Sequence, residues 1–181
     1  MLDSLNKQLK KAEKSYTIFS NRFGEKFTIR GKTIPEWTEY LRIVLPPDLD
    51  TKICQDVDVK LAALATEVSF YKGECECALQ FAKANYRKEF RKKYVGLVKS
   101  YKAGPSKLPS KDTITLESEE GLEDYQDVIT YSEMELSFWK EIISNLYTIR
   151  KIIESAAYTL GVEARAMNYQ NYLNNINNKG N

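Results

Sequence analysis

The chain contains no histidine, only three cysteines and no long uninterrupted apolar run. The missing histidine removes the commonest general base, the Ser-His and Cys-His nucleophile pairs, and every zinc site that includes an imidazole. Charged residues interrupt each apolar stretch, which argues against a membrane span of about 18 or more apolar residues. A hydrophobic content of 43% argues against a disordered chain. The 181 residues therefore predict a soluble, folded protein, and most familiar enzyme mechanisms are excluded.

The three cysteines predict neither a disulfide framework nor a metal motif. Cys54, Cys75 and Cys77 are odd in number, and a single residue separates the last two. Helical residues two apart point in different directions, so we expect Cys75 to be a small core residue and expect no metal site or cofactor. The first residues lack the apolar core of a secretory signal. This predicts a cytoplasmic, reducing location, in the host cytoplasm if a phage encodes the protein.

Residues 1–49 predict a small N-terminal segment with helices and a possible hairpin. Apolar residues recur at helical spacing within 1–14, at Leu2, Leu5, Leu9 and Ala12. Residues 26–34 hold two short β-rich runs around Arg30-Gly31, which predicts a short hairpin. Thr33 is expected to begin a helix, because Thr33-x-x-Glu36 has capping-box spacing. The expected apolar face of this helix contains Trp37, Tyr40, Leu41 and Val44, and Pro46-Pro47 are expected to end it.

Residues 50–167 predict a helical hairpin in which two long helices pack antiparallel, giving a mainly α fold. The first helix runs from about 50 to 101 and has apolar residues in heptad-like steps at Ile53, Val57, Leu61, Leu64, Val68, Tyr71, Cys75, Ala78 and Ala82. The second runs from about 124 to 169 with a stripe at Val128, Tyr131, Met134, Phe138, Ile142, Leu146, Ile149, Ile153, Ala156 and Leu160. Proline, glycine and serine after residue 103 predict a linker over 103–123.

Two helices cover only part of each other, which predicts a homo-oligomer. The predicted interface residues are Leu136, Phe138, Trp139, Ile143 and Ile152. Residues 168–181 hold seven asparagines and predict a disordered tail.

The net charge of +2 conceals a strong separation of charge along the chain. Residues 83–111 hold ten basic residues and one acidic residue, Glu89. Residues 112–135 hold nine acidic residues and no basic one. The acidic segment is either a solvated linker or a negative strip that competes with DNA for the basic helix or docks a basic partner.

The basic window predicts a nucleic-acid interface, because basic side chains reach phosphates while aromatic rings stack on unpaired bases. The residues assigned to it are Lys83, Arg87, Lys88, Arg91, Lys92, Lys93, Lys99, Lys102 and Tyr94. The alternative is that the aromatic residues at 86, 90 and 94 belong to the core. The lysines would then form a solvated face paired with the acidic segment of the same or a neighbouring molecule.

A carboxylate–Mg²⁺ enzyme is a further class to test. All-helical nucleotide pyrophosphatases hold metal with an ExxE motif followed by ExxD, and Glu117-Ser-Glu-Glu120 supplies the first part. No ExxD follows it in the sequence. We therefore expect no catalytic activity of this class, and no enzyme.

Short motifs between about 55 and 165 resemble the UvsY-like recombination mediators of tailed phages. They are Phe70-Tyr71-Lys72-Gly73, Asp127-Val128-Ile129, Leu136-Ser137-Phe138-Trp139, Ile142-Ile143 and Ile153-Glu154-Ser155. In that family basic residues precede the aromatic-aromatic-x-Gly element, whereas here the basic cluster follows it, so the DNA-binding residues are assigned from charge alone. The resemblance implies a homo-oligomeric ring that binds single-stranded DNA, with a recombinase and a single-strand-binding protein as partners.

Two functions follow from these patterns. The first is a single-stranded-DNA-binding recombination mediator that helps to load a recombinase. The alternative is a non-catalytic helical scaffolding or interaction protein, such as a virion component or an inhibitor, whose two charge blocks pair between subunits.

Overall fold

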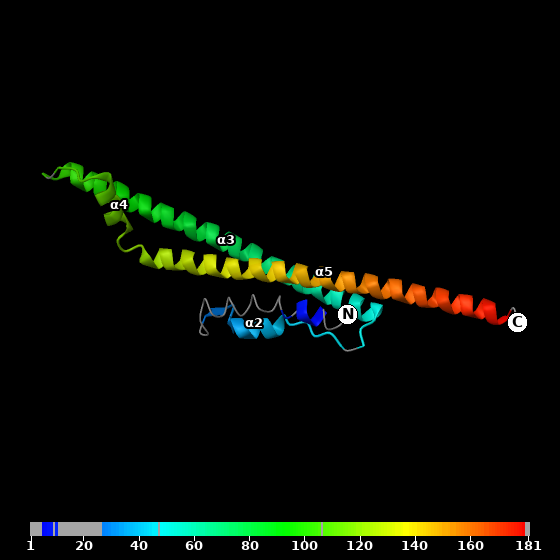
Figure 1. Ribbon diagram of the computed structural model, residues 1–181. Helices are drawn as coiled ribbons and strands as arrows, with labels where there is room; N and C mark the ends of the chain where they lie inside the picture. Colours follow the sequence, from blue (N-terminus) through cyan, green and yellow to red (C-terminus); the bar gives the residue numbers. More distant parts are fainter. Residues whose placement is uncertain (1–4, 9, 11–26, 47, 106, 180–181) are drawn as a thin grey trace. The chain divides into compact units, whose positions relative to one another are not determined.

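The computed structural model describes residues 5–8, 10, 27–46, 48–105 and 107–179, with side chains as far as residue 171. The elements follow in the order β1 (Thr28–Ile29), β2 (Lys32–Thr33), α2 (Ile34–Tyr40), α3 (Thr51–Ala103), α4 (Lys111–Glu119) and α5 (Glu123–Lys179) (Figure 1). The fold is mainly α, which confirms the predicted class. The chain divides into two compact units, which we call unit 1 (within residues 1–69 and 141–181) and unit 2 (residues 70–140).

The predicted hairpin is present in unit 1. Strands β1 and β2 pair antiparallel, with Thr28 opposite Thr33 and Ile29 opposite Lys32. The two turn residues, Arg30 and Gly31, both have positive φ, at 51° and 76°. This is the backbone that a two-residue hairpin turn requires, and glycine adopts it without the steric cost that a Cβ brings.

Helix α2 begins with the predicted capping box at Thr33 and Glu36. The Thr33 amide donates to Glu36 Oε2 at 2.7 Å, and the Glu36 amide donates to Thr33 Oγ1 at 3.4 Å. The Thr33 amide, as the largest cause, and the Thr33 hydroxyl, which donates to Glu36 Oε2 at 2.8 Å, hold the pKa of Glu36 below its ordinary value. The Trp37 indole N–H donates to the Ile29 carbonyl at 2.8 Å, which ties α2 to the hairpin. Ile29, Ile34, Trp37 and Leu41 are buried.

Helix α2 is shorter than the sequence predicted. It ends at Tyr40, before Pro46-Pro47, and burial then alternates, with Leu41 and Ile43 buried and Arg42 and Val44 exposed. Alternation of this kind belongs to an extended segment that places every second side chain in the core. The helical face predicted through Val44 is therefore wrong beyond Leu41.

Helix α3 confirms the first long helix. Its start is capped by Asp50, whose Oδ1 accepts from the Ile53 amide at 2.7 Å. It ends at Ala103, directly before Gly104-Pro105, where the sequence predicted a break.

In unit 1 the first part of α3 packs against the second part of α5. The buried residues are Cys54, Leu61, Leu64 and Val68 from α3, and Ile142, Leu146, Ile149, Ile153 and Ala156 from α5. At the edge of this core Arg150 Nε donates to Asp58 Oδ1 at 2.7 Å, and Arg150 Nη2 donates to Asp58 Oδ2 at 3.2 Å. These two bonds add a polar contact between α3 and α5 to the buried apolar side chains.

In unit 2 the second part of α3 packs against α4 and the first part of α5. Cys75, Leu79 and Ala82 are buried from α3, and Ile129, Leu136, Phe138 and Trp139 from α5. The Tyr71 and Trp139 rings lie 5.1 Å apart, and Lys83 pairs with Glu133. From the first contact to the second, the residue number rises on α3 and falls on α5. The two helices therefore run antiparallel here, as predicted.

Three of the predicted oligomer-interface residues are core residues of this chain. The side chains of Leu136, Phe138 and Trp139 are 8%, 1% and 0% exposed, so they offer no free apolar surface to another copy. Ile143 and Ile152 in unit 1 are half-buried. The prediction placed Leu136 and Trp139 beside the main stripe, but the buried band of α5 is wide enough to include them. Self-association stays a prediction, without these three as its contacts.

The predicted linker over 103–123 contains a helix, α4. Ser110 caps it by accepting from the Thr113 amide at 3.2 Å, and Ile114 and Ser118 are buried on its inner side. The turn into α5 passes through Gly121, whose φ is 72° and where a Cβ would lie 3.1 Å from Lys93 Nζ. The interpretation of the acidic segment, residues 112–135, as a solvated linker is therefore wrong, because α4 and the start of α5 occupy it and Ile114, Ser118 and Leu122 are buried.

Helix α5 continues beyond the predicted end near Tyr169 and stops at Lys179. The asparagine-rich stretch from residue 168 is thus helical as far as 179 rather than disordered. Asparagine is a weak helix former, but no proline or glycine lies between 162 and 179 to break the backbone pattern. Of the helix predicted within residues 1–14, residues 5–8 and 10 are helical and Leu5 is buried; the remainder lies outside the described residues.

Candidate nucleic-acid interface

Six of the predicted basic residues lie together on the outer side of α3 in unit 2. We call them the basic face: Arg87, Lys88, Arg91, Lys92, Lys99 and Lys102. All six side chains are exposed. At about 100° per residue they fall within about 140° of the helix circumference, and at about 1.5 Å per residue they span about 22 Å along its axis. The face is a strip of positive charge with a gap of about 10 Å between Lys92 and Lys99.

Acidic side chains neutralise little of this strip. Glu89 is the sole acidic residue of α3 after Glu76, and it pairs with Lys92 at 3.6 Å, where the Lys92 side chain remains 78% exposed. An exposed pair of this kind adds little stability and leaves the lysine accessible. Within the described part of the chain, the other five residues of the basic face have no ion-pair partner.

Lys83 and Lys93 were predicted as DNA contacts but are engaged inside unit 2. Lys83 Nζ lies 2.7 Å from Glu133 Oε1 on α5. Lys93 Nζ donates to the Glu120 carbonyl at the end of α4. Both lysines are half-buried, and both hold the acidic segment against α3. For Lys83 and Lys93, the alternative that lysines pair with the acidic segment of the same molecule is therefore the correct one.

The aromatic residues of the basic window form a ladder on another side of α3. The Tyr86 and Phe90 rings stack at 6.3 Å between centroids, and the Phe90 and Tyr94 rings at 6.0 Å. All three are half-buried. Burial raises the pKa of the Tyr86 phenol, and the nearby Glu119 carboxylate adds to the rise. Tyr94, assigned from the sequence to DNA, is part of this ladder and not of the basic face.

The acidic segment is folded against α3 by a second polar contact. Tyr101 Oη donates to Glu117 Oε2 on α4 at 2.7 Å, and this bond raises the pKa of Tyr101 above its ordinary value. Glu117 was the first residue of the candidate ExxE motif, and its carboxylate is occupied by this contact. Exposed acidic side chains remain on α4 and the start of α5, at Asp112, Glu119, Glu120, Glu123, Asp124 and Asp127. Unit 2 thus carries a basic face on α3 and an acidic surface on α4 and α5.

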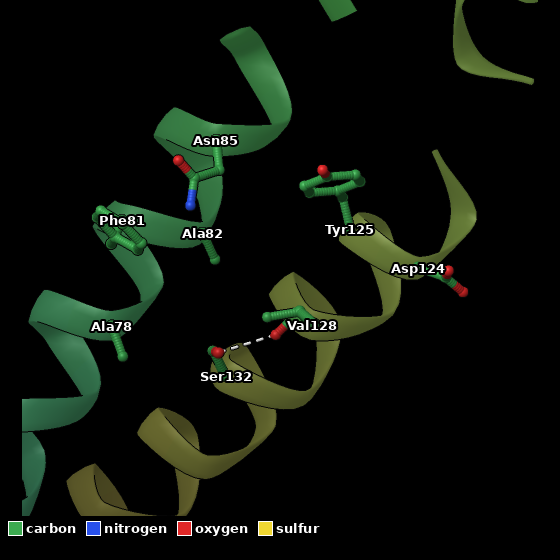
Figure 2. A pocket seen from close by; sticks show the side chains of 8 residues that line it. All are labelled: Ala78, Phe81, Ala82, Asn85, Asp124, Tyr125, Val128 and Ser132. Carbon is green, nitrogen blue, oxygen red and sulfur yellow. Dashed lines mark hydrogen bonds between the residues drawn. The ribbon is translucent and has the colours of Figure 1, made fainter. Parts of the chain in front are cut away.

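Beside the basic face lies an open groove that the sequence did not indicate. It has a volume of about 560 Å³ and is lined by Ala78, Phe81, Ala82, Asn85, Asp124, Tyr125, Val128 and Ser132 (Figure 2). Phe81 is 70% exposed and Val128 is 56% exposed. Val128 was predicted in the buried stripe, and Ile129 is buried in its place. A one-residue shift in helical register produces this exposure, and no sequence pattern fixes such a shift.

The cysteines and carboxylates of the described chain do not assemble into a metal centre. Cys54 and Cys75 are buried and Cys77 is exposed, and all three are free. The buried position of Cys75 confirms its predicted place in the core. No group of three or more cysteine, aspartate or glutamate side chains that could hold a metal ion occurs among the residues placed by the structure.

No family model, no curated protein and no solved structure matches this chain. The resemblance to the UvsY-like mediators accordingly stays a prediction from sequence motifs. None of the helices in the described ranges combines the length and apolar character needed to cross a membrane.

Proposed function

We propose that this protein binds single-stranded DNA through the basic face of α3. The observation that carries the proposal is the exposure of six basic side chains over about 22 Å of one helix, five of them without an ion-pair partner in the described chain. Such a strip gains free energy when it displaces the counterions condensed on a phosphate backbone. This mode of binding needs no contact with the base edges, so it does not depend on the base sequence of the DNA.

The role of recombination mediator extends this proposal and is supported by the motif resemblance alone. A homo-oligomer that carries several basic faces would hold one strand at several points, and its avidity would exceed the affinity of a single face. A strand held in this way follows a path on which a recombinase can nucleate. The partners in this role are a recombinase and a single-strand-binding protein, and the protein itself performs no catalysis.

The direct test removes charge from the basic face. The variant replaces Arg87, Arg91 and Lys92 with alanine, and fluorescence anisotropy with a labelled oligo-dT measures binding. We expect affinity at low salt to fall by about tenfold or more. The slope of log K against log salt should shrink by about 2, because each lost phosphate contact contributes about 0.7. Alanine is the best helix former, so the circular dichroism should be unchanged.

The matched control removes the same charge from unit 1. Lys52, Lys60 and Lys151 are exposed on α3 and α5 outside unit 2. Their replacement by alanine lowers the net charge equally and should leave the salt slope near that of the wild type. Equal losses in both variants would show that binding follows net charge rather than the basic face. Unchanged binding in the first variant would remove the face from the interaction.

A scaffolding protein with charge-paired assembly is the second candidate, favoured by the separate basic and acidic surfaces of unit 2. In that case the basic face of one copy contacts the acidic residues of α4 and α5 on another. Light scattering discriminates between the two. An assembly held by charge pairs should dissociate at high salt and show no affinity for DNA. A mediator oligomer held by apolar contacts should stay assembled at high salt, and only its bound DNA should dissociate.

A further inference from the structure

The outer side of α3 continues the basic face toward Phe81. Phe81, Asn85, Lys88, Lys92 and Lys99 follow one another in steps of four, three, four and seven residues. These steps keep all five on one stripe of the helix. The stripe therefore carries an aromatic ring and an amide at one end and three ammonium groups along the rest.

Phe81 is the exposed aromatic residue of this stripe. Its side chain is 70% exposed, whereas Tyr86, Phe90 and Tyr94 stack on one another on another side of α3. An exposed phenylalanine leaves its apolar ring in contact with water, and covering the ring is favourable. The rings that the sequence offered for base stacking are already engaged, whereas Phe81 has no ring contact with any residue that the structure describes.

The groove beside Phe81 combines apolar and aromatic side chains with a few polar groups, as a nucleobase requires. Ala78 and Ala82 on α3 keep it open because their side chains are small, and the Tyr125 ring of α5 lies over the space between the two helices (Figure 2). Asn85 at the rim has no hydrogen-bond partner within the described chain and can bond to the edge of a base. The Ser132 hydroxyl donates to the Val128 carbonyl at 2.8 Å, so toward a base it can act only as an acceptor.

The charges around the groove orient a strand. The Asp124 carboxylate points away from α3 (Figure 2), and with Asp127 and Glu123 it gives the α5 side a negative field. A phosphate is repelled there and attracted over Lys88 and Lys92 on α3. A strand on the basic face would therefore keep its backbone over α3 and turn its bases toward the groove.

We infer that Phe81 stacks on a nucleobase of the strand held by the basic face, and that the groove between α3 and α5 of unit 2 receives that base. The inference rests on the proposed function and adds to it the group that distinguishes single strands from duplexes. Bases in a duplex are stacked on their neighbours and have no free face for Phe81, whereas every base of a single strand has one.

The test is a double-mutant cycle between Phe81 and the bases. Anisotropy is measured for the wild type and Phe81→Ala with labelled oligo-dT, and with an oligonucleotide of equal length whose bases are removed. Phe81→Ala should weaken oligo-dT binding about five- to tenfold, and should change binding of the abasic strand less than about twofold. The variant Phe81→Trp should restore oligo-dT binding, because it keeps a stacking ring.

Tyr158→Ala is the matched control, since Tyr158 is 73% exposed on α5 in unit 1. It should bind both strands as the wild type does. If Phe81→Ala weakens both strands equally, or neither, the inference is overturned while the basic face still binds DNA. A changed molar mass of Phe81→Ala in light scattering, with DNA binding intact, would instead assign the groove to a second copy of this chain. If the wild type binds neither strand, the proposed function itself fails.

Discussion

Tyr101 shows how a single side chain fixes the acidic segment in place. Its hydroxyl donates to Glu117, and this is the largest cause of its raised pKa, ahead of desolvation and the charge of Glu117. A group whose pKa is raised on folding contributes stability in its protonated form. That contribution is complete below the ordinary value of 10.0 and is lost as the pH rises through the raised value. Above it, a phenolate faces a carboxylate, and the contact between α4 and α3 becomes repulsive.

Replacing Glu117 with glutamine should lower the pH at which Tyr101 ionises. The measurement is the tyrosinate absorbance in a spectrophotometric titration, with Tyr101→Phe subtracted to isolate this phenol from the other eleven tyrosines. The wild-type difference curve should have its midpoint above 10.0, and the Glu117→Gln curve should lie at lower pH. Coincident curves would mean that Tyr101 does not donate to Glu117 in solution.

The role of a residue was predictable where it depends on neighbours in the sequence. It was not predictable where it depends on a partner far away in the sequence. Thr33 and Glu36 cap α2 as their spacing indicates, and Arg30-Gly31 makes the expected turn, because both depend on neighbours within three residues. Trp139 was assigned to an oligomer surface but packs on Tyr71, which lies far away in sequence. Lys93 was assigned to DNA but bonds to the Glu120 carbonyl. No periodicity reveals such partners.

At the scale of elements, the two long helices and most of their buried stripes were predictable, but the C-terminal end of α5 and the burial at some stripe positions were not. The predicted seam of α3 contained Ile53 and Ala78, whereas Cys54 and Leu79 are buried instead. A helix turns by about 100° per residue, so a shift of one position still satisfies most of an apolar stripe. Helix α4 was missed because its acidic residues suggested a linker. The signal that reveals it is the Ser110 cap followed by Ile114 and Ser118 at helical spacing.

The register of α3 can be tested by shortening apolar side chains on its two sides. Leu79 is 6% exposed and Val95 is 49% exposed. We expect Leu79→Ala to lower the free energy of unfolding by about 2–5 kcal/mol, because it removes buried methyl groups and leaves a cavity. Val95→Ala should change it by less than about 0.5 kcal/mol. Urea denaturation followed by circular dichroism measures both, and a larger loss in Val95→Ala would show that the helix is rotated.

At the scale of the whole molecule, charge is balanced in number but separated in space. The sequence has 27 basic and 25 acidic residues, and its pI is about 8.3. Within unit 2 the numbers of basic and acidic residues are equal, yet the basic face lies on α3 while most of the exposed acidic residues lie on α4, on α5 or in the turn between them. The field near the basic face therefore differs from what the net charge indicates, and it favours anions at that face.

The central claim is that this charge separation creates a site for single-stranded DNA. The most direct measurement is the affinity of the wild-type protein for labelled oligo-dT and for a duplex of equal length, over a series of salt concentrations. The account predicts tighter binding of the single strand and a slope of log K against log salt of up to about −4, from as many as six phosphate contacts at about −0.7 each. Absence of binding at low salt, or a slope near zero, would contradict the account.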